Sequence, residues 1–384
     1  MNNQQIIEKK PIIAIAIMIK NESTSIQGTL YSMFKAGIRD FFILDTGSTD
    51  NTIEITRKFF VQHQLNGYIH QEPFIDFSTS RNRTLELAEQ HFLHIPFLLM
   101  PDADWYLRNG KALLTFCEKE KQTNCPLYGL KIKMNGIEFT TARLFRTVSR
   151  IRFKGVVHEI PAIPAEYGVP LSIYFEVNAT SVGIEKSKQR WQKDLQLLLA
   201  AYRENSYDSR NVFYLAQTYE CLNDVDNAYR FYQLREKLTG CDAEKFVTLL
   251  RLGQLARRIQ HTDSALGWAT AMDYFLKALV LRPHRIEPLL QIADYYWPEN
   301  IPACYLFVSH AYDKPYPVQD QHFIDKLAYQ YTRYEIMSRC AWHMGEFALG
   351  EKATLLALEA QPGTPHLLNN LNLYQQKNQS QDAP

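Results

Sequence analysis

Two pairs of aspartates, each separated by a single residue, are the first candidates for chemistry in this chain. Asp102 and Asp104 follow the apolar run FLLM, whereas Asp224 and Asp226 lie between two helical segments. Carboxylates at this spacing can hold a divalent cation, because alternate positions on an extended chain point the same way. The spacing alone does not separate a metal site from ordinary loop residues, so the surrounding sequence has to decide.

The composition indicates a globular protein of more than one domain. Its 384 residues are 46% hydrophobic and 22% charged, which is typical of two or three folded domains. The net charge of +1 provides no basic surface, so nucleic acid is not expected as a partner. The six cysteines form no C-x-x-C motif, which favours free thiols in a reducing compartment over disulfides or a zinc site.

The N-terminal segment KKPIIAIAIMIKNE has the positive charge and the apolar run of a signal peptide but lacks the cleavage site. The run stops at Lys20 without a small-residue cleavage site. No apolar run approaches the roughly 20 residues that a membrane span needs. We therefore expect residues 12–19 to form a strand buried on both faces, in a cytoplasmic protein with no transmembrane segment.

The first half of the chain alternates short apolar runs with helical patterns. The expected strands are 12–19, 41–45, 68–71 and 97–101. The expected helices between them are 23–36, 51–64 and 79–91. This alternation predicts an α/β fold with a mostly parallel, Rossmann-like sheet covered on both faces. From residue 127 to about 180 the runs become short and irregular, which indicates edge strands and hairpins.

The second half of the chain is helical and contains an internal repeat. Small residues, aromatics and prolines recur at the spacing of tetratricopeptide repeats, and the small ones are Ala216, Ala228, Gly253, Ala256, Ala271, Ala278, Ala341, Gly345, Gly350 and Ala357. Small residues let paired helices approach closely, and each pair buries its apolar face on the next. The predicted order is a flexible N-terminus (1–10), an α/β domain (11–185), a helical repeat domain (186–375) and a disordered tail (376–384).

This organisation separates the two aspartate pairs. Asp224 and Asp226 fall in the turn between two helices of the first repeat, where acidic residues cap helices, so they are interpreted as structural. Asp102 and Asp104 follow a buried strand, where an open α/β sheet places its ligands. Three further polar clusters follow strands or open a helix: KNES, DTGSTDNT and DFSTSRN, at 20–23, 45–52 and 76–82. The carboxyl ends of parallel strands share one edge, so all four clusters should converge on one crevice.

Several familiar motifs of nucleotide and hydrolase sites are absent from the sequence. It contains no G-x-x-x-x-G-K-[ST] phosphate loop and no G-x-G-x-x-G dinucleotide fingerprint. The stretch TGSTD also departs from the G-x-S-x-G nucleophile elbow. The crevice is therefore expected to bind its ligand by another arrangement.

Taken together, the motifs resemble the inverting family 2 glycosyltransferases of GT-A fold. KNES, DTGSTDNT, FIDFSTSRNRTLELA, MPDAD and RLFRTVSRIRFKGVVHEI occur in the order seen in bacterial members that carry tetratricopeptide repeats. Peptide S-glycosyltransferases are among those members. The resemblance covers residues 11 to about 160 well and the repeats more loosely.

The resemblance implies a nucleotide-diphosphate sugar as donor, usually a uridine diphosphate sugar. Glu22 and Asp45 would face the base and ribose of the nucleotide. Asp50 would support the following loop and touch the nucleotide, while Arg81 and Asn82 would lie near the diphosphate, where an arginine can bind phosphate through two hydrogen bonds.

The resemblance also implies a metal site at the first aspartate pair. Asp102 and Asp104 would bind Mn²⁺ or Mg²⁺ beside the donor, with Asp104 as the more direct ligand, and His158 would complete the metal shell. The chemistry supports this independently, because a departing sugar diphosphate needs a compensating cation. Carboxylate and imidazole ligands suit Mn²⁺ well.

An inverting transfer also needs a base on the face opposite the leaving group. Glu159 is the first candidate because it follows His158 directly. Neighbouring residues on a strand point to opposite faces, so both residues can serve only if VHE forms a loop. Asp76 and Glu138 are the reserve candidates, since the sequence lacks the E-D pair that the family often has.

The sequence therefore predicts a metal-dependent inverting glycosyltransferase that acts on a peptide, protein or glycan acceptor. Two alternatives stay open: an inactive GT-A domain serving a tetratricopeptide scaffold, and a nucleotidyltransferase, although its Gly-rich activator loop is missing. The repeats offer a concave surface for a peptide, a glycan or a second subunit, so a homodimer is also considered.

Overall fold

The computed structural model describes residues 10–134, 137–165, 168–177, 183–259, 264–320 and 323–381. The chain divides into two compact units, residues 1–201 and 202–384. The division falls inside helix α5 (Gly183–Glu204), whereas the sequence placed the boundary at 185/186. Apart from Lys10, the N-terminus expected to be flexible lies outside the described residues.

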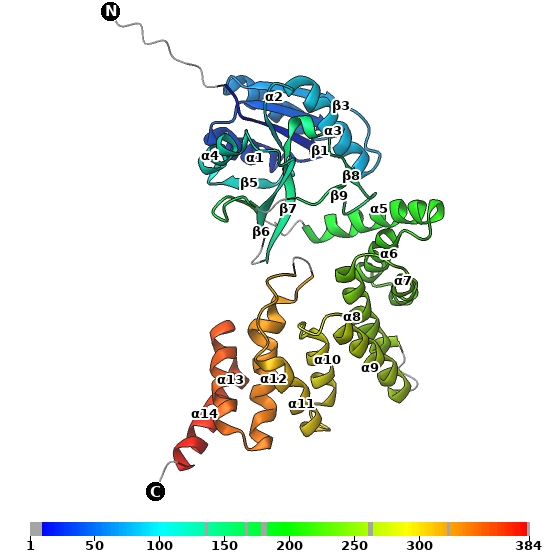
Figure 1. The fold of residues 1–384 in the computed structure, drawn as a ribbon, viewed down its shortest axis with the longest axis vertical. Helices are drawn as coiled ribbons and strands as arrows, with labels where there is room; N and C mark the ends of the chain where they lie inside the picture. The colour runs from blue at the N-terminus through cyan, green and yellow to red at the C-terminus, as the bar shows by residue number, and fades with distance from the viewer. Residues whose placement is uncertain are drawn as a thin grey trace, which may run out of the picture. The chain divides into compact units, whose positions relative to one another are not determined.

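An eight-stranded sheet forms the centre of the first unit (Figure 1). Its order is β3-β2-β1-β4-β7-β6-β10-β5. The strands are β1 (Ile13–Ile19), β2 (Asp40–Asp45), β3 (Asn66–Gln71), β4 (Phe97–Leu99), β5 (Trp105–Arg108), β6 (Leu127–Met134), β7 (Ile137–Arg146) and β10 (Tyr174–Val177). The first four strands pair in parallel, and β7 pairs antiparallel with β4 and β6. This confirms the predicted α/β class.

Helices cover both faces of the sheet. The helices are α1 (Ile26–Ala36), α2 (Thr52–Gln62), α3 (Phe77–Phe92) and α4 (Gly110–Glu120). Helices α1, α2 and α4 share a core with Ile13, Ile15 and Ile17, whereas α3 packs with Ala14 and Ala16 on the other face. Both faces of β1 are therefore buried, which is why its sequence is continuously apolar.

The sequence missed β5 and α4, and it predicted short strands up to about residue 180 without locating β10 among them. Strand β5 is short and pairs antiparallel with β10, which lies far along the chain, so no local pattern announces either strand. Trp105 in β5 packs against Phe175 with ring centroids 5.3 Å apart and is 7% exposed. It belongs to the core, which leaves it little surface for an acceptor.

A small hairpin follows the sheet and carries the VHE motif. Strands β8 (Phe153–Lys154) and β9 (Ile160–Pro161) pair antiparallel, after a short 3-10 helix, η1 (Thr147–Ser149). The segment 155–159 forms the turn between them. The prediction of hairpin material in this region is confirmed, and so is the condition that VHE forms a loop.

The described part of the second unit consists of helices that pack in consecutive pairs (Figure 1). They are α6 (Ser209–Cys221), α7 (Val225–Lys237), α8 (Asp242–Ile259), α9 (Ser264–Leu281), α10 (Glu287–Tyr296), α11 (Ile301–Tyr312), a π-helical turn η2 (Ala328–Thr332), α12 (Arg333–Cys340), a 3-10 turn η3 (Ala341–Met344), α13 (Phe347–Ala360) and α14 (Pro365–Gln381). A Cβ atom at Gly253 would collide with Phe275, and one at Gly350 with Tyr374. The close approach predicted for the repeat glycines is confirmed at both positions.

Two details of the helical unit differ from the sequence analysis. Gly345 ends η3 with φ 76°, so it serves a left-handed turn and not a helix contact. The tail expected to be disordered from residue 376 instead continues α14 to Gln381, and Asn378 donates to Glu351 at 2.5 Å. The hydrogen bond fixes the polar end of this helix.

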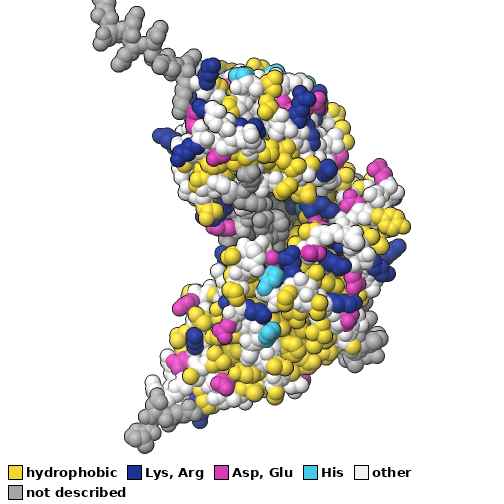
Figure 2. Space-filling view, viewed as in Figure 1, with side chains coloured by type: hydrophobic (Ala, Val, Ile, Leu, Met, Phe, Trp, Pro, Cys, Tyr) yellow, Lys and Arg dark blue, Asp and Glu magenta, His cyan; other side chains and the backbone are white. Residues whose placement is uncertain are grey.

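The surface of the helical unit carries exposed apolar side chains. Figure 2 shows a broad hydrophobic area on one face of this unit. The exposed apolar side chains of the unit include Leu276 and Val280 of α9 and Leu306 of α11. Such a surface suits the predicted second copy, which remains a prediction. No helix in the described part of the chain is long and apolar enough to cross a membrane.

Candidate active site

The first two polar clusters interlock where β1 and β2 end. Asn21 N–H donates to Ser48 Oγ at 2.9 Å, and Thr49 N–H donates to Asn21 Oδ1 at 2.7 Å. Glu22 N–H donates to Thr52 Oγ1 at 2.8 Å. KNES and DTGSTDNT thus form one edge, as predicted from the parallel strands.

Asp50 holds this edge together. Its carboxylate accepts from Ser23 N–H at 3.2 Å and from Thr52 Oγ1 at 2.5 Å. Partial desolvation would raise the pKa of Asp50, but these hydrogen bonds outweigh it and bring the pKa to about 2. The predicted support of the loop is observed.

Asp45 also accepts hydrogen bonds from the protein backbone. The side chain is completely buried and accepts from the N–H groups of Gly47 and Ser48 at 3.3 and 3.1 Å. Gly47 has φ 97°, a conformation that glycine adopts without strain. The carboxylate therefore shapes the turn between β2 and α2.

Arg81 is the centre of the charged site. Its Nη2 donates to Asp102 Oδ1 at 2.5 Å, and its Nε pairs with the carboxylate of Glu159. Arg81 is 6% exposed. Burial would lower the pKa of Arg81, but Asp102 and Glu159 raise it above its usual range. One arginine thus joins the D-x-D motif to the candidate base.

Asp102 has a second guanidinium beside it. Arg143 Nη2 lies 3.6 Å from Asp102 Oδ2, and the guanidinium lies over the rings of Trp105 and Phe153 at 5.0 and 5.7 Å. Burial would raise the pKa of Asp102, but Arg81 and Arg143 lower it. Asp102 is therefore held as an anion between two arginines.

Asp104 has the opposite environment from Asp102. Asp104 is exposed at the surface, but loss of hydration from the protein around its carboxyl, followed by repulsion from Asp102 and Glu22, raises its pKa to about 6. The two aspartates were predicted to face the same way, but β4 ends at Leu99 and the segment is a turn, so strand alternation does not apply.

The carboxylates around Asp104 fit a cation that binds together with a phosphate ligand better than a metal centre formed by the protein alone. No three His, Cys, Asp or Glu side chains converge as a metal-binding group in the described ranges. Asp104, repelled by two other carboxylates, is the group that a cation would stabilise. Mg²⁺ is commonly held by one or two carboxylates together with substrate phosphates.

His158 and Glu159 occupy the turn of the β8–β9 hairpin. His158 is exposed and has φ 48°, in the left-handed region. The Glu159 side chain is 8% exposed and turns inward to Arg81. The base candidate is thus assembled with the D-x-D motif, whereas the role of His158 as a metal ligand stays a prediction.

Asn82 contacts the protein backbone where the sequence placed it near the diphosphate. Its Nδ2 donates to Phe153 O at 2.9 Å, and its Oδ1 accepts from Phe153 N–H at 2.7 Å. Both ends of the amide are therefore engaged with β8. Asn82 positions the hairpin that carries Glu159.

The two reserve candidates for the base have other partners. Asp76 caps α3 and accepts from Thr79 N–H at 2.7 Å. Glu138 pairs with Lys131 and Lys133 at 3.0 and 3.1 Å. These contacts are structural and leave Glu159 as the strongest candidate.

Asp194 of α5 was missed by the sequence analysis. It is 5% exposed, and its Oδ1 has no hydrogen-bond partner in the part of the chain that the structure describes. Burial, opposed by Arg190 and assisted by Glu159, raises the pKa of Asp194 to about 6. A raised pKa means that the folded chain holds this proton more tightly, so the stability it contributes is present below about pH 4 and is lost as pH rises through 6.

The chain resembles known glycosyltransferases in sequence. No family model matches it. Over 190 residues it is 27% identical to the SPbeta prophage-derived glycosyltransferase SunS of Bacillus subtilis (strain 168), and equally to glycosyltransferase SunS of Bacillus phage SPbeta. The match covers 47% of this chain and 43% of SunS, less than half of either protein. The resemblance read from the motifs is confirmed at this level.

Solved structures give more distant likenesses. The chain is similar to S. aureus TarS 1-349, crystallised in complex with UDP-GlcNAc, with a TM-score of 0.35, 15% identity and coverage of 78% of this chain and 90% of that one. It is also similar to YrrB, a TPR protein with an unusual peptide-binding site, with a TM-score of 0.36, 16% identity and coverage of 48% and 85%.

Proposed function

We propose that this chain is an inverting glycosyltransferase that transfers a sugar from a nucleotide-diphosphate sugar, foremost a uridine diphosphate sugar, to a peptide, protein or glycan. The observation that carries the proposal is the ion-pair chain from Asp102 through Arg81 to Glu159, at the sheet edge where KNES and DTGSTDNT meet. The similarity to SunS supports the same activity.

The edge formed by the first two clusters would bind the nucleotide. Glu22 lies at the end of β1 and accepts from Ser25 Oγ at 2.6 Å, within electrostatic reach of Asp104. Asp45 and Asp50 keep the adjoining turn in shape. Arg81 is the cation nearest the D-x-D motif and could exchange one carboxylate for a phosphate, because a guanidinium binds both in the same geometry.

Glu159 would take the proton of the acceptor. Its carboxylate is fixed on one side by Arg81 Nε, and its backbone is fixed by the hairpin that Asn82 holds. A base must be oriented before it is useful, and this site orients it from two directions. The acceptor would then approach from the side of the β8–β9 turn.

A divalent cation would be held by Asp104 and oxygens of the donor. Bound there, Mn²⁺ or Mg²⁺ would neutralise the charge of the departing diphosphate. Asp102, engaged with Arg81 and near Arg143, would keep the arginines in place beside it. His158 lies in the neighbouring turn as the proposed additional ligand.

Calorimetric titration of uridine diphosphate, with and without Mn²⁺, tests the proposal. The wild type should bind in a Mn²⁺-dependent manner, and Asp104→Ala should not. Asp226→Ala is the matched control, because it changes the second aspartate of the other D-x-D pair, in the first turn of α7. If the wild type binds none of the uridine, guanosine and thymidine diphosphates, the proposal fails and an inactive GT-A domain on a repeat scaffold replaces it.

A further inference from the structure

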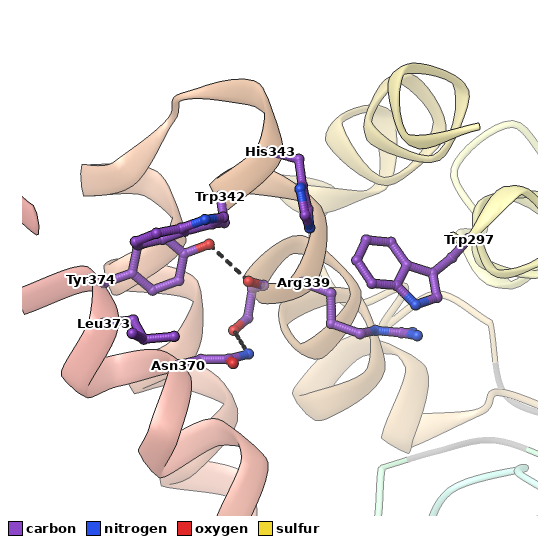
Figure 3. Close-up of a pocket in the computed structure, with 8 residues that line it drawn as sticks. Trp297, Arg339, Trp342, His343, Asn370, Leu373 and Tyr374 are labelled. Carbon is purple, nitrogen blue, oxygen red and sulfur yellow. Dashed lines mark hydrogen bonds between the residues drawn. The ribbon is translucent and has the colours of Figure 1, made fainter. Parts of the chain in front are cut away.

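The helical unit contains a cavity to which the proposed transfer reaction gives no role (Figure 3). It lies among α12, η3, α14 and Trp297, and its volume is about 220 Å³. This equals roughly seven water molecules of the liquid, at about 30 Å³ each. The cavity can take a single ring or one side chain but not a folded segment.

Aromatic rings form its walls. Trp342 and Trp297 lie on opposite sides of the cavity in Figure 3. Trp342 packs on Tyr374 with centroids 5.4 Å apart, and Trp297 lies against the Arg339 guanidinium at 5.3 Å. Both indoles are only partly buried, so part of each ring is available to a ligand.

Polar groups that can form further hydrogen bonds line the same cavity. The indole N–H groups of Trp297 and Trp342 and the His343 ring form no hydrogen bond with any described residue. Asn370 donates its Nδ2 to Ser338 Oγ at 3.2 Å, which leaves its amide oxygen as an acceptor. Donors and an acceptor thus border the aromatic walls.

The cavity has little net charge to offer an anion. Arg339 Nε lies 3.0 Å from Glu335 Oε1, and its Nη2 lies 3.8 Å from Asp294 Oδ1. These carboxylates offset the guanidinium charge. A carboxylate or phosphate ligand would therefore find no uncompensated cation, and an uncharged ligand is favoured.

We propose that this cavity binds one ring of a neutral saccharide. The C–H face of a pyranose would lie on an indole, and its hydroxyls, which both donate and accept, would match the indole N–H groups, His343 and Asn370. An aromatic or aliphatic peptide side chain would fill the walls but would make none of these hydrogen bonds. The inference concerns the helical unit alone and does not rest on the proposed transferase activity.

Saturation-transfer NMR on the full chain tests the site, with methyl glycosides of glucose, galactose and N-acetylglucosamine as probes. Saturating uridine diphosphate and Mg²⁺, which is diamagnetic, keep the donor site occupied. At least one glycoside should bind with a dissociation constant on the order of millimolar, as a single small ring allows. The signal should persist in Asp104→Ala.

Two tryptophan substitutions on α14 locate the signal. Leu373 and Leu368 are 41% and 49% exposed, but only Leu373 lines the cavity. Leu373→Trp should fill the cavity and abolish glycoside binding, whereas Leu368→Trp should leave it unchanged. Both leucines are exposed enough for the chain to fold with either substitution.

Three results would overturn the inference. The first is that no glycoside binds the wild type, and the second is that Leu373→Trp binds as well as Leu368→Trp. The third is that N-acetylphenylalanine amide binds more tightly than every glycoside, which would make the cavity a site for a peptide side chain. A signal lost in Asp104→Ala would assign the glycoside to the donor site and count equally against the inference.

Discussion

Removing Arg81 should destabilise the first unit because it leaves two carboxylates without their main partner. The Arg81 and Glu159 side chains are 7% and 8% exposed, so water screens their pair little. Deleting one member of a buried pair costs about 3–5 kcal/mol. Asp102 keeps Arg143 at 3.6 Å, so we expect Arg81→Met to fall at the lower end, about 3 kcal/mol.

A double-mutant cycle isolates the Arg81–Glu159 pair. Glu159→Gln removes the charge that Arg81→Met leaves unpaired, so the double variant should be about 1–2 kcal/mol more stable than the sum of the single changes predicts. Denaturant unfolding measures all four proteins, and hydrogen exchange in peptides from residues 10–177 assigns the change to the first unit. Additivity within about 0.5 kcal/mol would refute the ion pair as the contact that organises this site.

Three further changes test other contacts. Relative to Asp194→Asn, the wild type should lose about 3 kcal/mol of stability as pH rises from about 3 to about 7, measured by denaturant unfolding at each pH. Asn82→Ala should cost about 1–3 kcal/mol and speed hydrogen exchange in residues 151–161, because Phe153 loses two hydrogen bonds. Gly350→Ala should cost about 1–3 kcal/mol in thermal unfolding through its clash with Tyr374, whereas Gly168→Ala, with open space around it, should be neutral.

The convergence of the polar clusters could be predicted because parallel strands obey strong rules. Apolar runs located β1 and β2 within a residue or two, and their parallel pairing brings Asn21 and Thr49 together. The order of the motifs then placed Arg81 and Glu159 at the same edge. Local sequence and general topology were sufficient for the convergence of the strand ends, whereas the place of Glu159 came from the resemblance to the glycosyltransferase family.

Features that depend on partners distant in the chain could not be predicted. Asp194 lies in a helix with ordinary polar neighbours, and only the fold brings it within electrostatic reach of Glu159. Asn82 belongs to a motif that suggested phosphate binding, but its hydrogen bonds go to Phe153, 71 positions later. The partners of both residues come from distant parts of the chain, and the spacing of residues in the sequence does not predict such contacts.

The two aspartates of MPDAD lie in different electrostatic environments. Asp102 lies beside two buried guanidiniums that lower its pKa, whereas loss of hydration, followed by repulsion from Asp102 and Glu22, raises the pKa of Asp104 to about 6. Environments that push two nearby carboxyls apart are the usual means of giving them separate roles. Asp102 therefore holds the arginines and, through Arg81, the proposed base Glu159, and Asp104 is the carboxylate that we propose for a cation. The turn that breaks the strand after Leu99 makes this division possible, because on a continuous strand both side chains would share one environment.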